Sequence, residues 1–295
     1  MSEPRRLART AQQQTISIRG LAYRLHCWGA PDGDPLLLLH GWGDTGASFQ
    51  FLVDALGDRR VVAPDWRGFG DTEWSAGGYW FPDYLADLDA ILDHLSPDGP
   101  ACIVGQSMGG NVAGLYAGAR PERVKALVLV EGFGLRASDP RDAPLRYRQW
   151  LEEQLEPRAF RRYASIEDFA NRLRARSPRL SPDRSRFVAE AWSRADGEGG
   201  RVLKADPAHK RVNPVLYRRA EAEACWRAVR TPVLLVAGEE SPFAGLLDEM
   251  WLKRSDSGIF PDARRETIPE SGHMVHHEQP ERLAELIERF LRIVG

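Results

Sequence analysis

Short apolar runs recur along this chain of 295 residues, separated by segments of helical length. They lack alternating polar positions, which is typical of strands that helices bury on both faces. The runs that predict buried strands are residues 36–39, 61–63, 101–104, 126–130 and 233–237, with a last strand at 266–268. Residues 15–18 and 21–28, joined at Gly20, predict a hairpin at the antiparallel edge of the sheet.

The intervening segments have the periodicity of amphipathic helices, most clearly at residues 81–95 and 281–294, where apolar residues recur every three or four positions. Strands that alternate with helices predict an α/β fold. We expect a mostly parallel, doubly wound sheet of about eight strands, with the chemistry at the carboxyl ends of the strands.

This alternation stops between residues 132 and 230, which are rich in proline and arginine and contain three helix-length segments: 145–155, 166–176 and 184–192. We predict a helical cap inserted into one core domain. In this division residues 1–131 are the N-terminal part of the core, 132–230 the cap, and 231–295 the C-terminal part of the core.

The cap is also basic, because residues 134–230 carry 22 Lys and Arg against 14 Asp and Glu. The simpler interpretation is that these arginines line solvated helix faces; the alternative is that some face an acidic substrate. Arg201 to Pro214 is the part that we expect to approach a pocket. Aromatic residues could equally form a pocket for an apolar acyl chain: Trp42, Phe49, Trp66, Phe133, Trp150 and Trp192.

Composition narrows the class of protein. With 43% hydrophobic and 28% charged residues and a net charge of -2, the chain gives no reason to expect nucleic acid as a partner. Cys27, Cys102 and Cys225 are odd in number and far apart, which argues against a disulfide framework. Neither a signal-like apolar segment nor a membrane-spanning run is present, so we expect a soluble, cytoplasmic protein without membrane insertion.

The candidate nucleophile is Ser107. It follows the predicted strand 101–104, precedes a helix-forming segment, and is flanked by Gly105 and Gly109 in a G-x-S-x-G pattern. A sharp turn between strand and helix needs small residues on both sides of its centre. We expect a strained backbone at Ser107, an exposed Oγ, and the Met108 N–H placed where an oxyanion would form.

A serine hydroxyl needs a base to remove its proton as it attacks. Of the seven histidines, His273 is the favoured base, because it follows the last predicted strand in a loop that can reach back over the turn. A metal site made of His273, His276 and His277 is the weaker interpretation, since adjacent histidines converge poorly on one ion.

Together, the motifs of the chain resemble those of α/β-hydrolase-fold serine hydrolases, in the same order and over nearly the whole length. They are His40-Gly-Trp-Gly43, Pro64-Asp-Trp-Arg-Gly-Phe-Gly70, Gly105-Gln-Ser-Met-Gly-Gly110 and Ser271-Gly-His-Met-Val-His-His-Glu-Gln-Pro280. The resemblance implies that His273 is the base, that the backbone N–H groups of Trp42 and Met108 form the oxyanion hole, and that His40 fixes the loop.

The chain departs from the family at the third catalytic position. The family's acid usually ends a Gly-x-x-Asp turn, but here that turn is Gly238-Glu-Glu-Ser241. Some relatives carry the acid after the preceding core strand, which offers Glu131. A carboxylate directly after a buried apolar strand requires a partner, and an imidazolium would be one, so we favour Glu131. Glu240 is the alternative; Glu239, Asp248 or no acid remain.

These residues predict a carboxylesterase-like serine hydrolase, acting on a small-molecule acyl substrate through an acyl-enzyme, with no metal or organic cofactor. A serine at the turn argues against epoxide hydrolases and haloalkane dehalogenases of this fold, which have aspartate there. Hydrolysis of a carbon–carbon, lactone or amide bond, or perhydrolysis, would use the same groups. A catalytically idle binding protein is the alternative from another class, suggested by Ser241.

Overall fold

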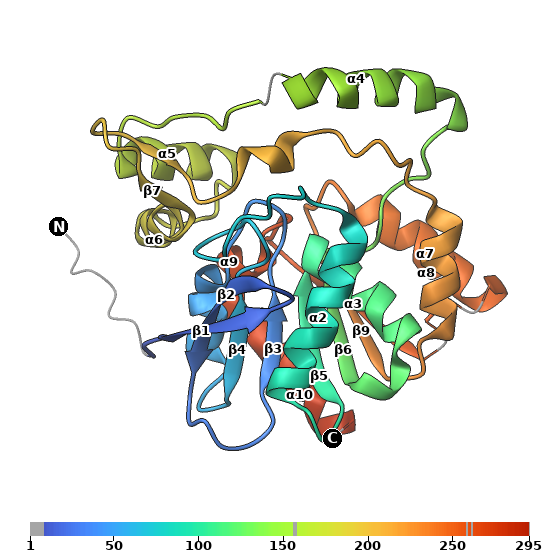
Figure 1. The fold of residues 1–295 in the computed structure, drawn as a ribbon. Coiled ribbons are helices and arrows are strands. Elements are labelled where there is room, and N and C mark those ends of the chain that lie inside the picture. Colours follow the sequence, from blue (N-terminus) through green and yellow to red (C-terminus); the bar gives the residue numbers. More distant parts are fainter. Residues whose placement is uncertain (1–8, 156–157, 258, 261, 295) are drawn as a thin grey trace.

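A computed structural model describes residues 9–155, 158–257, 259–260 and 262–294, with only the backbone described at 251–257. Its centre is an eight-stranded sheet in the order β1-β2-β4-β3-β5-β6-β9-β10 (Figure 1). Strand β2 is antiparallel to both of its neighbours, β1 and β4, and all pairs from β4 to β10 are parallel. The strands are β1 Gln12–Ile18, β2 Leu21–Trp28, β3 Leu36–Leu39, β4 Val61–Pro64, β5 Ala101–Gln106, β6 Val124–Val130, β9 Val233–Gly238 and β10 Ala263–Ile268. The predicted sheet and its edge hairpin are therefore confirmed.

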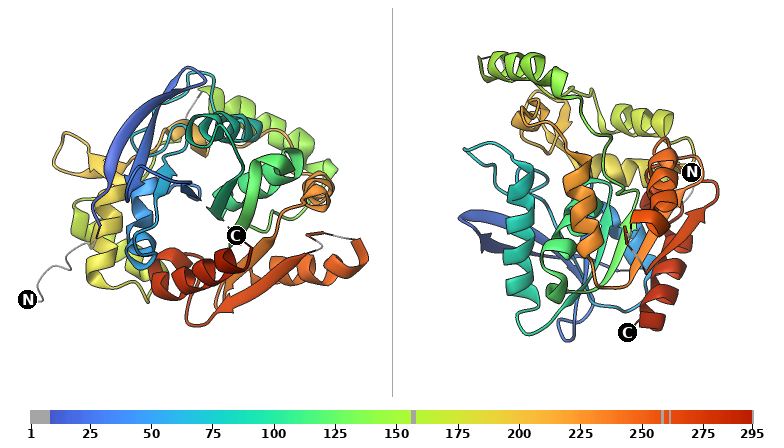
Figure 2. Two further views of the ribbon diagram at one scale, coloured as in Figure 1. Left: turned by 90° about the horizontal axis from the view of Figure 1, so that it is seen from below. Right: turned by 90° about the vertical axis from the view of Figure 1, so that its right-hand side faces the viewer.

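Helices cover both faces of this sheet. They are α1 Gln50–Ala55, α2 Phe81–Leu95, α3 Met108–Ala119, α7 Arg219–Ala228, α8 Ala244–Ser257, α9 Val275–Glu278 and α10 Pro280–Val294. In Figure 2 (left), α10 lies on one side of the strands, and α2 and α3 lie on the other. Alternate residues of a strand pack against the helices on opposite faces of the sheet. In β3, Leu37 and Leu39 pack toward α2 and α3, whereas Leu36 and Leu38 pack toward α1 and α10.

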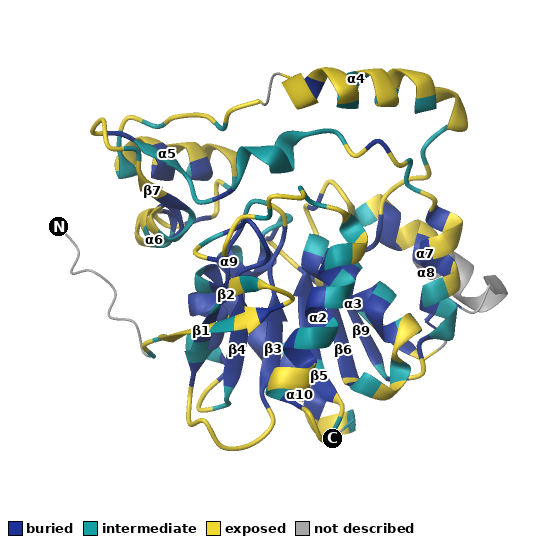
Figure 3. Ribbon diagram, in the orientation of Figure 1, coloured by how far each residue is buried: buried dark blue, intermediate teal, exposed yellow. Residues whose placement is uncertain are grey.

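The central strands β3, β4, β5, β6 and β9 are almost entirely buried, as Figure 3 shows, whereas the edge strand β1 is mostly exposed. This burial on both faces explains why the chain has continuous apolar runs at these strands rather than alternating ones. Cys27, Cys102 and Cys225 are free thiols. None of the described helices is long and apolar enough to cross a bilayer.

The segment between β6 and β9 adds no strand to the central sheet. Its elements are α4 Ala143–Leu155, α5 Ile166–Arg176, α6 Pro182–Trp192, a hairpin of β7 Ser193–Ala195 and β8 Arg201–Leu203, and the 3-10 turn η4 Pro207–Lys210. Residues 139–155 and 158–214, which we call the cap segment, lie above the core in Figure 1, where α4 is mostly exposed (Figure 3). The core and the cap segment meet at Phe69 and Ala205, which form a β-bridge.

The end of the predicted cap differs from expectation. We placed its boundary at residue 230, which included α7, but α7 packs against α3 of the core. The side chain of Trp226 is fully buried in the core cluster, and a Cβ on Gly118 of α3 would lie 2.0 Å from the backbone oxygen of Cys225. The close approach that Gly118 permits makes α7 part of the layer that covers the sheet.

Candidate active site

Ser107 lies on the turn between β5 and α3 with φ 50° and ψ -115°, a conformation that non-glycine residues rarely adopt. Glycine is required on both sides of Ser107, because a larger side chain would clash with the neighbouring backbone. A Cβ on Gly105 would lie 2.5 Å from the backbone oxygen of Gly109, and one on Gly109 would lie 2.2 Å from that of Leu39. The G-x-S-x-G pattern therefore reflects close packing of the turn against β3, and it leaves Ser107 partly accessible.

His273 lies between β10 and α9, where the chain turns back over the Ser107 turn. Its Nε2 is 3.0 Å from Ser107 Oγ. The side-chain amide of Gln106 donates to the backbone oxygen of His273 at 3.2 Å, so the residue before the serine also holds the histidine loop. Sequence reasoning missed Gln106, because it occupies a variable position of the motif.

Glu131 follows β6 and points at the other nitrogen of the same imidazole. Its Oε2 is 3.0 Å from His273 Nδ1, and its Oε1 accepts a hydrogen bond from the Gly238 N–H at 2.7 Å. The backbone of Glu131 is left-handed, with φ 57°, and its N–H donates to the Val236 oxygen at 2.9 Å. The neighbouring strand β9 thus compensates for a conformation that costs about 1 kcal/mol or more.

The other candidate acids face elsewhere. The Glu240 side chain is 52% exposed and pairs with Arg179, whereas that of Glu131 is 0% exposed. Asp248 pairs with Arg265, and Glu239 accepts a hydrogen bond from the Glu270 N–H at 3.3 Å. Of the carboxylates considered from the sequence, Glu131 is therefore the one beside His273.

The loop after β3 passes directly against Ser107. A Cβ on Gly41 would lie 3.1 Å from the Cβ of Ser107 and 2.5 Å from Gln106 Oε1. Trp42 follows in this loop, and Met108 is the first residue of α3; both line one pocket. The two residues with the expected oxyanion N–H groups are thus brought to the same place by separate elements.

His40 is fully buried beneath this loop. Its Nδ1 lies 2.7 Å from the Gly41 oxygen, while its Nε2 accepts a hydrogen bond from the Trp66 N–H at 2.8 Å. An accepting Nε2 and a donating Nδ1 require the neutral imidazole. Burial also lowers the pKa of His40, so this ring is a neutral brace for the loop, as the sequence led us to expect.

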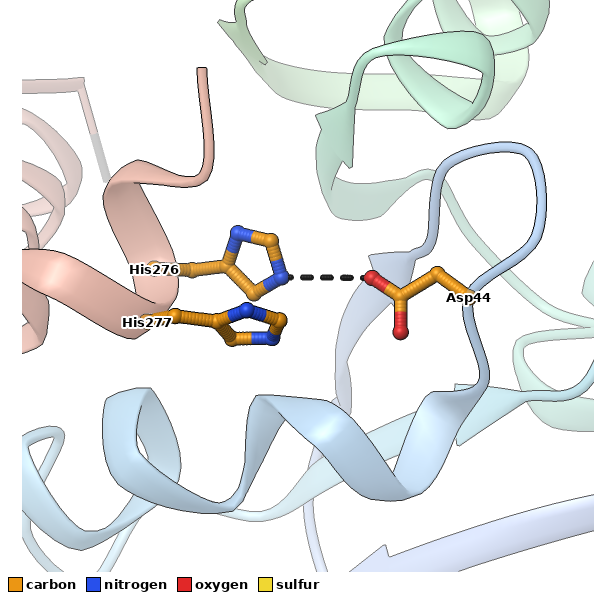
Figure 4. Close-up of side chains that lie close together, drawn as sticks. All are labelled: Asp44, His276 and His277. Carbon is orange, nitrogen blue, oxygen red and sulfur yellow. Dashed lines mark hydrogen bonds and ion pairs between the residues drawn. The ribbon is translucent and has the colours of Figure 1, made fainter. Parts of the chain in front are cut away.

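His276 and His277 do not join His273. They lie beside Asp44, and one ligand-type atom from each of the three residues falls within 4.8 Å of the others (Figure 4). Asp44 Oδ2 is 3.3 Å from His276 Nε2, and Oδ1 accepts from the Trp192 Nε1–H of the cap segment and from the Thr45 N–H. The sequence did not predict a role for Asp44, which is marked there only by its position close to the His40 motif.

The protonation of this cluster follows from its burial and from its contacts. Burial raises the pKa of Asp44, but the hydrogen bond from His276 and the charges of nearby histidines outweigh burial, so this pKa lies well below its ordinary value. Burial, together with His276, lowers the pKa of His277. His276 Nδ1 and His277 Nε2 have no hydrogen-bond partner among the described residues. The donor set could accept a transition-metal ion, but Asp44 already joins the loop after β3 to the cap segment and α9.

The pocket that Trp42 and Met108 line lies between the core and the cap segment and has a volume of about 220 Å³. From the predicted stretch Arg201 to Pro214, residues 208, 209 and 211–214 reach it. Of the six aromatic residues considered, Trp42 and Trp150 line it. Phe49, Trp66 and Phe133 are buried in the core, and Trp192 donates to Asp44.

Comparison with known proteins places this geometry in a family. The family model described as alpha/beta hydrolase fold matches residues 34–280. A serine hydrolase-like protein of Danio rerio is 28% identical over 97% of this chain and 90% of its own. A 2-hydroxymuconate semialdehyde hydrolase of a Pseudomonas species is 28% identical over 94% of this chain and 92% of its own.

Solved structures agree with the sequence comparison. The thioesterase domain from the curacin biosynthetic pathway superimposes with a TM-score of 0.83 at 25% identity, covering 95% of this chain and 99% of that domain. The fold, the family model and the relatives all give the same assignment, and this chain belongs to the α/β-hydrolase family.

Proposed function

We propose that this protein is a serine hydrolase that cleaves a carboxylic ester or a related acyl substrate through an acyl-enzyme. The observation that carries the proposal is the continuous chain of hydrogen-bond distances from Ser107 Oγ through His273 to Glu131, with 3.0 Å at each step. Such a chain supplies a nucleophile, a base and a carboxylate that orients the base.

In the proposed reaction, Ser107 Oγ attacks the acyl carbon while His273 Nε2 takes its proton. Glu131 accepts the Nδ1–H of His273 and stabilises the imidazolium that forms. The backbone N–H groups of Trp42 and Met108 stabilise the oxyanion, and His273 protonates the leaving group. Water, deprotonated by the same imidazole, then releases the acid and regenerates Ser107.

Hydrolysis of a carbon–carbon bond is the second candidate, and it is supported by the 2-hydroxymuconate semialdehyde hydrolase that resembles this chain over most of its length. It would use the same three side chains. The idle binding protein has less support, because the serine at position 241 accompanies a buried carboxylate, Glu131, at hydrogen-bonding distance from His273.

A fluorophosphonate probe tests the proposal. We expect the probe to label the native protein, and we expect Ser107→Ala to lose the label. Ser17→Ala, on the exposed face of β1, is the matched control and should label like the native protein. A pre-steady-state burst of 4-nitrophenol from a 4-nitrophenyl ester would support the acyl-enzyme. Absence of labelling in the native protein would refute the proposed function.

A further inference from the structure

Six aromatic side chains line the pocket that contains Trp42 and Met108, the residue that follows Ser107. Residues of the loop before α2 and of α2 itself form one side, and α4 of the cap segment contributes Trp150. The aromatic residues that line it are Trp42, Tyr79, Trp80, Phe81, Tyr84 and Trp150. A pocket of this kind suits an apolar or aromatic body on the substrate.

His209 adds a neutral ring to these walls. It is stacked between Phe69 and Tyr79, with ring centroids 3.8 and 3.6 Å away. Burial lowers the pKa of His209 to about 4, so the ring is uncharged near neutral pH. Burial also raises the pKa of Tyr79 and Tyr84, which keeps both phenols neutral.

Arg211 is the one group with a full charge among the described residues that line this pocket, and no carboxylate lines it. Several other arginines of the cap segment are paired with carboxylates, as Arg162 is with Asp196 and Arg184 with Glu281. The Arg211 Nε–H is buried and has no hydrogen-bond partner among the described residues. Arg211 therefore lines an aromatic pocket, and no carboxylate of the described residues is within ion-pair distance of it.

The nearby acid Glu153 does not fill this role. Its carboxylate already lies 3.0 Å from Arg158 and accepts hydrogen bonds from Gln149 at 2.9 Å and from the Val212 N–H at 2.6 Å. Burial raises the pKa of Glu153, but these hydrogen bonds and the charges of Arg158 and Arg211 outweigh burial and lower it. Within the described structure, Glu153 forms no ion pair with Arg211. An anion in the pocket would satisfy Arg211 directly.

We infer that this pocket is a subsite for a carboxylate, and that the substrate joins an apolar or aromatic body to that carboxylate at some distance from its scissile acyl bond. Arg211 binds the carboxylate, and the aromatic walls bind the body. The inference rests on the proposed function, because it assigns this pocket to the substrate of Ser107, whose neighbour Met108 lines the pocket. The inference requires one arginine of the basic cap, Arg211, to face an acidic substrate, and it leaves the others free to line solvated helix faces.

Paired ester substrates test the subsite. The probes are 4-nitrophenyl half-esters of dicarboxylic acids of increasing length, each compared with its methyl-capped neutral diester. We expect the native protein to have the higher kcat/KM for the half-ester at one or more lengths. Arg211→Leu should lower the half-ester to diester ratio by about tenfold or more, chiefly through KM, and Arg211→Lys should retain part of the preference.

Arg172→Leu is the matched control, because Arg172 is an exposed arginine of α5 outside the pocket and its loss changes the net charge equally. This variant should keep the native ratio. A ratio that is the same in native protein and Arg211→Leu would overturn the subsite. A preference for the neutral diester at every length would do so as well.

A binding experiment separates failure of the subsite from failure of the proposed function. Titration calorimetry of the half-esters into Ser107→Ala, with and without Arg211→Leu, measures the subsite without turnover. If Arg211→Leu weakens binding about tenfold while the native protein neither labels nor turns over any ester, the proposed function fails and the subsite stands. If labelling and turnover occur but Arg211→Leu changes neither binding nor the ratio, only the subsite fails.

Discussion

Ser241 Oγ donates a hydrogen bond to Glu131 Oε2, the same carboxylate oxygen that lies 3.0 Å from His273 Nδ1. The residue at the position where the family usually has its acid thus contacts the carboxylate that we propose as the acid. The departure at position 241 and the glutamate at position 131 are therefore parts of one arrangement.

The first prediction concerns the acid. Glu131→Gln should lower kcat/KM for a 4-nitrophenyl ester by about 10³-fold or more, because the amide favours the wrong imidazole tautomer. Glu240→Gln is the control and should remain near native activity, since Glu240 pairs with Arg179 at the surface. If Glu131→Gln retains native activity, Glu131 has no catalytic role.

The second prediction exchanges the two positions. Ser241→Asp alone should reduce activity and shift the pH–rate profile, because two adjacent buried carboxylates cannot both ionise easily. In the Glu131→Gln background, the same change should recover about tenfold or more of the lost kcat/KM, since a single carboxylate is restored beside His273. Comparing the double variant with Glu131→Gln tests this directly, and no recovery would argue that the position of the carboxylate is fixed at residue 131.

The third prediction concerns the turn that carries Ser107. Gly109→Ala should lower the free energy of unfolding by about 3 kcal/mol or more, because the added Cβ would lie 2.2 Å from the Leu39 backbone oxygen. Gly99→Ala is the control, since a Cβ there meets nothing within 4 Å. Urea unfolding of the two variants gives the comparison, and equal effects would mean that the turn relaxes freely.

The fourth prediction concerns Asp44. Asp44→Asn should destabilise the protein by about 3 kcal/mol, because it removes a buried charge that joins His276 and Trp192 to the loop after β3. Trp192→Phe should cost about 1 kcal/mol from its lost hydrogen bond, together with some lost packing. Asp98→Asn, at an exposed loop position, serves as the control. Urea unfolding should rank the three variants in that order, and a neutral Asp44→Asn would contradict the linking role.

The fifth prediction concerns pH and follows from His209. Its pKa is about 4 in the folded protein against 6.5 ordinarily, because burial disfavours its charged form. Between these values the unfolded chain binds a proton that the folded protein excludes. Stability is therefore present above pH 6.5 and decreases as pH falls toward 4, by about 1.4 kcal/mol per pH unit for one proton.

Burial of His40 and His277 acts in the same direction. Urea unfolding between about pH 7 and pH 5 should show this loss, and His209→Phe, which keeps a ring between Phe69 and Tyr79, should reduce the slope by up to one proton. An unchanged slope in His209→Phe would mean that His209 binds its proton equally in the folded and unfolded chain.

By itself the sequence determined the sheet, its edge hairpin and the turn at Ser107. These features depend on local patterns, because continuous apolar strands and the glycines of a tight turn must occur at fixed places along the chain. Glu131 was favoured on similar grounds, since a carboxylate directly after a buried strand requires a partner. The packing of α7 against α3 could not be predicted, because the amphipathic pattern of α7 does not say which neighbour covers its apolar face.

Tertiary structure alone decided the contacts between distant segments. It brought His273 to Ser107 across 166 positions of sequence, separated His276 and His277 from His273, and placed Asp44 beside them. It also placed Arg211, rather than another arginine of the cap segment, at the pocket, because the pairing and burial of a side chain depend on other elements. Local residue patterns specify backbone conformation, whereas the partner of a charge is set by long-range packing.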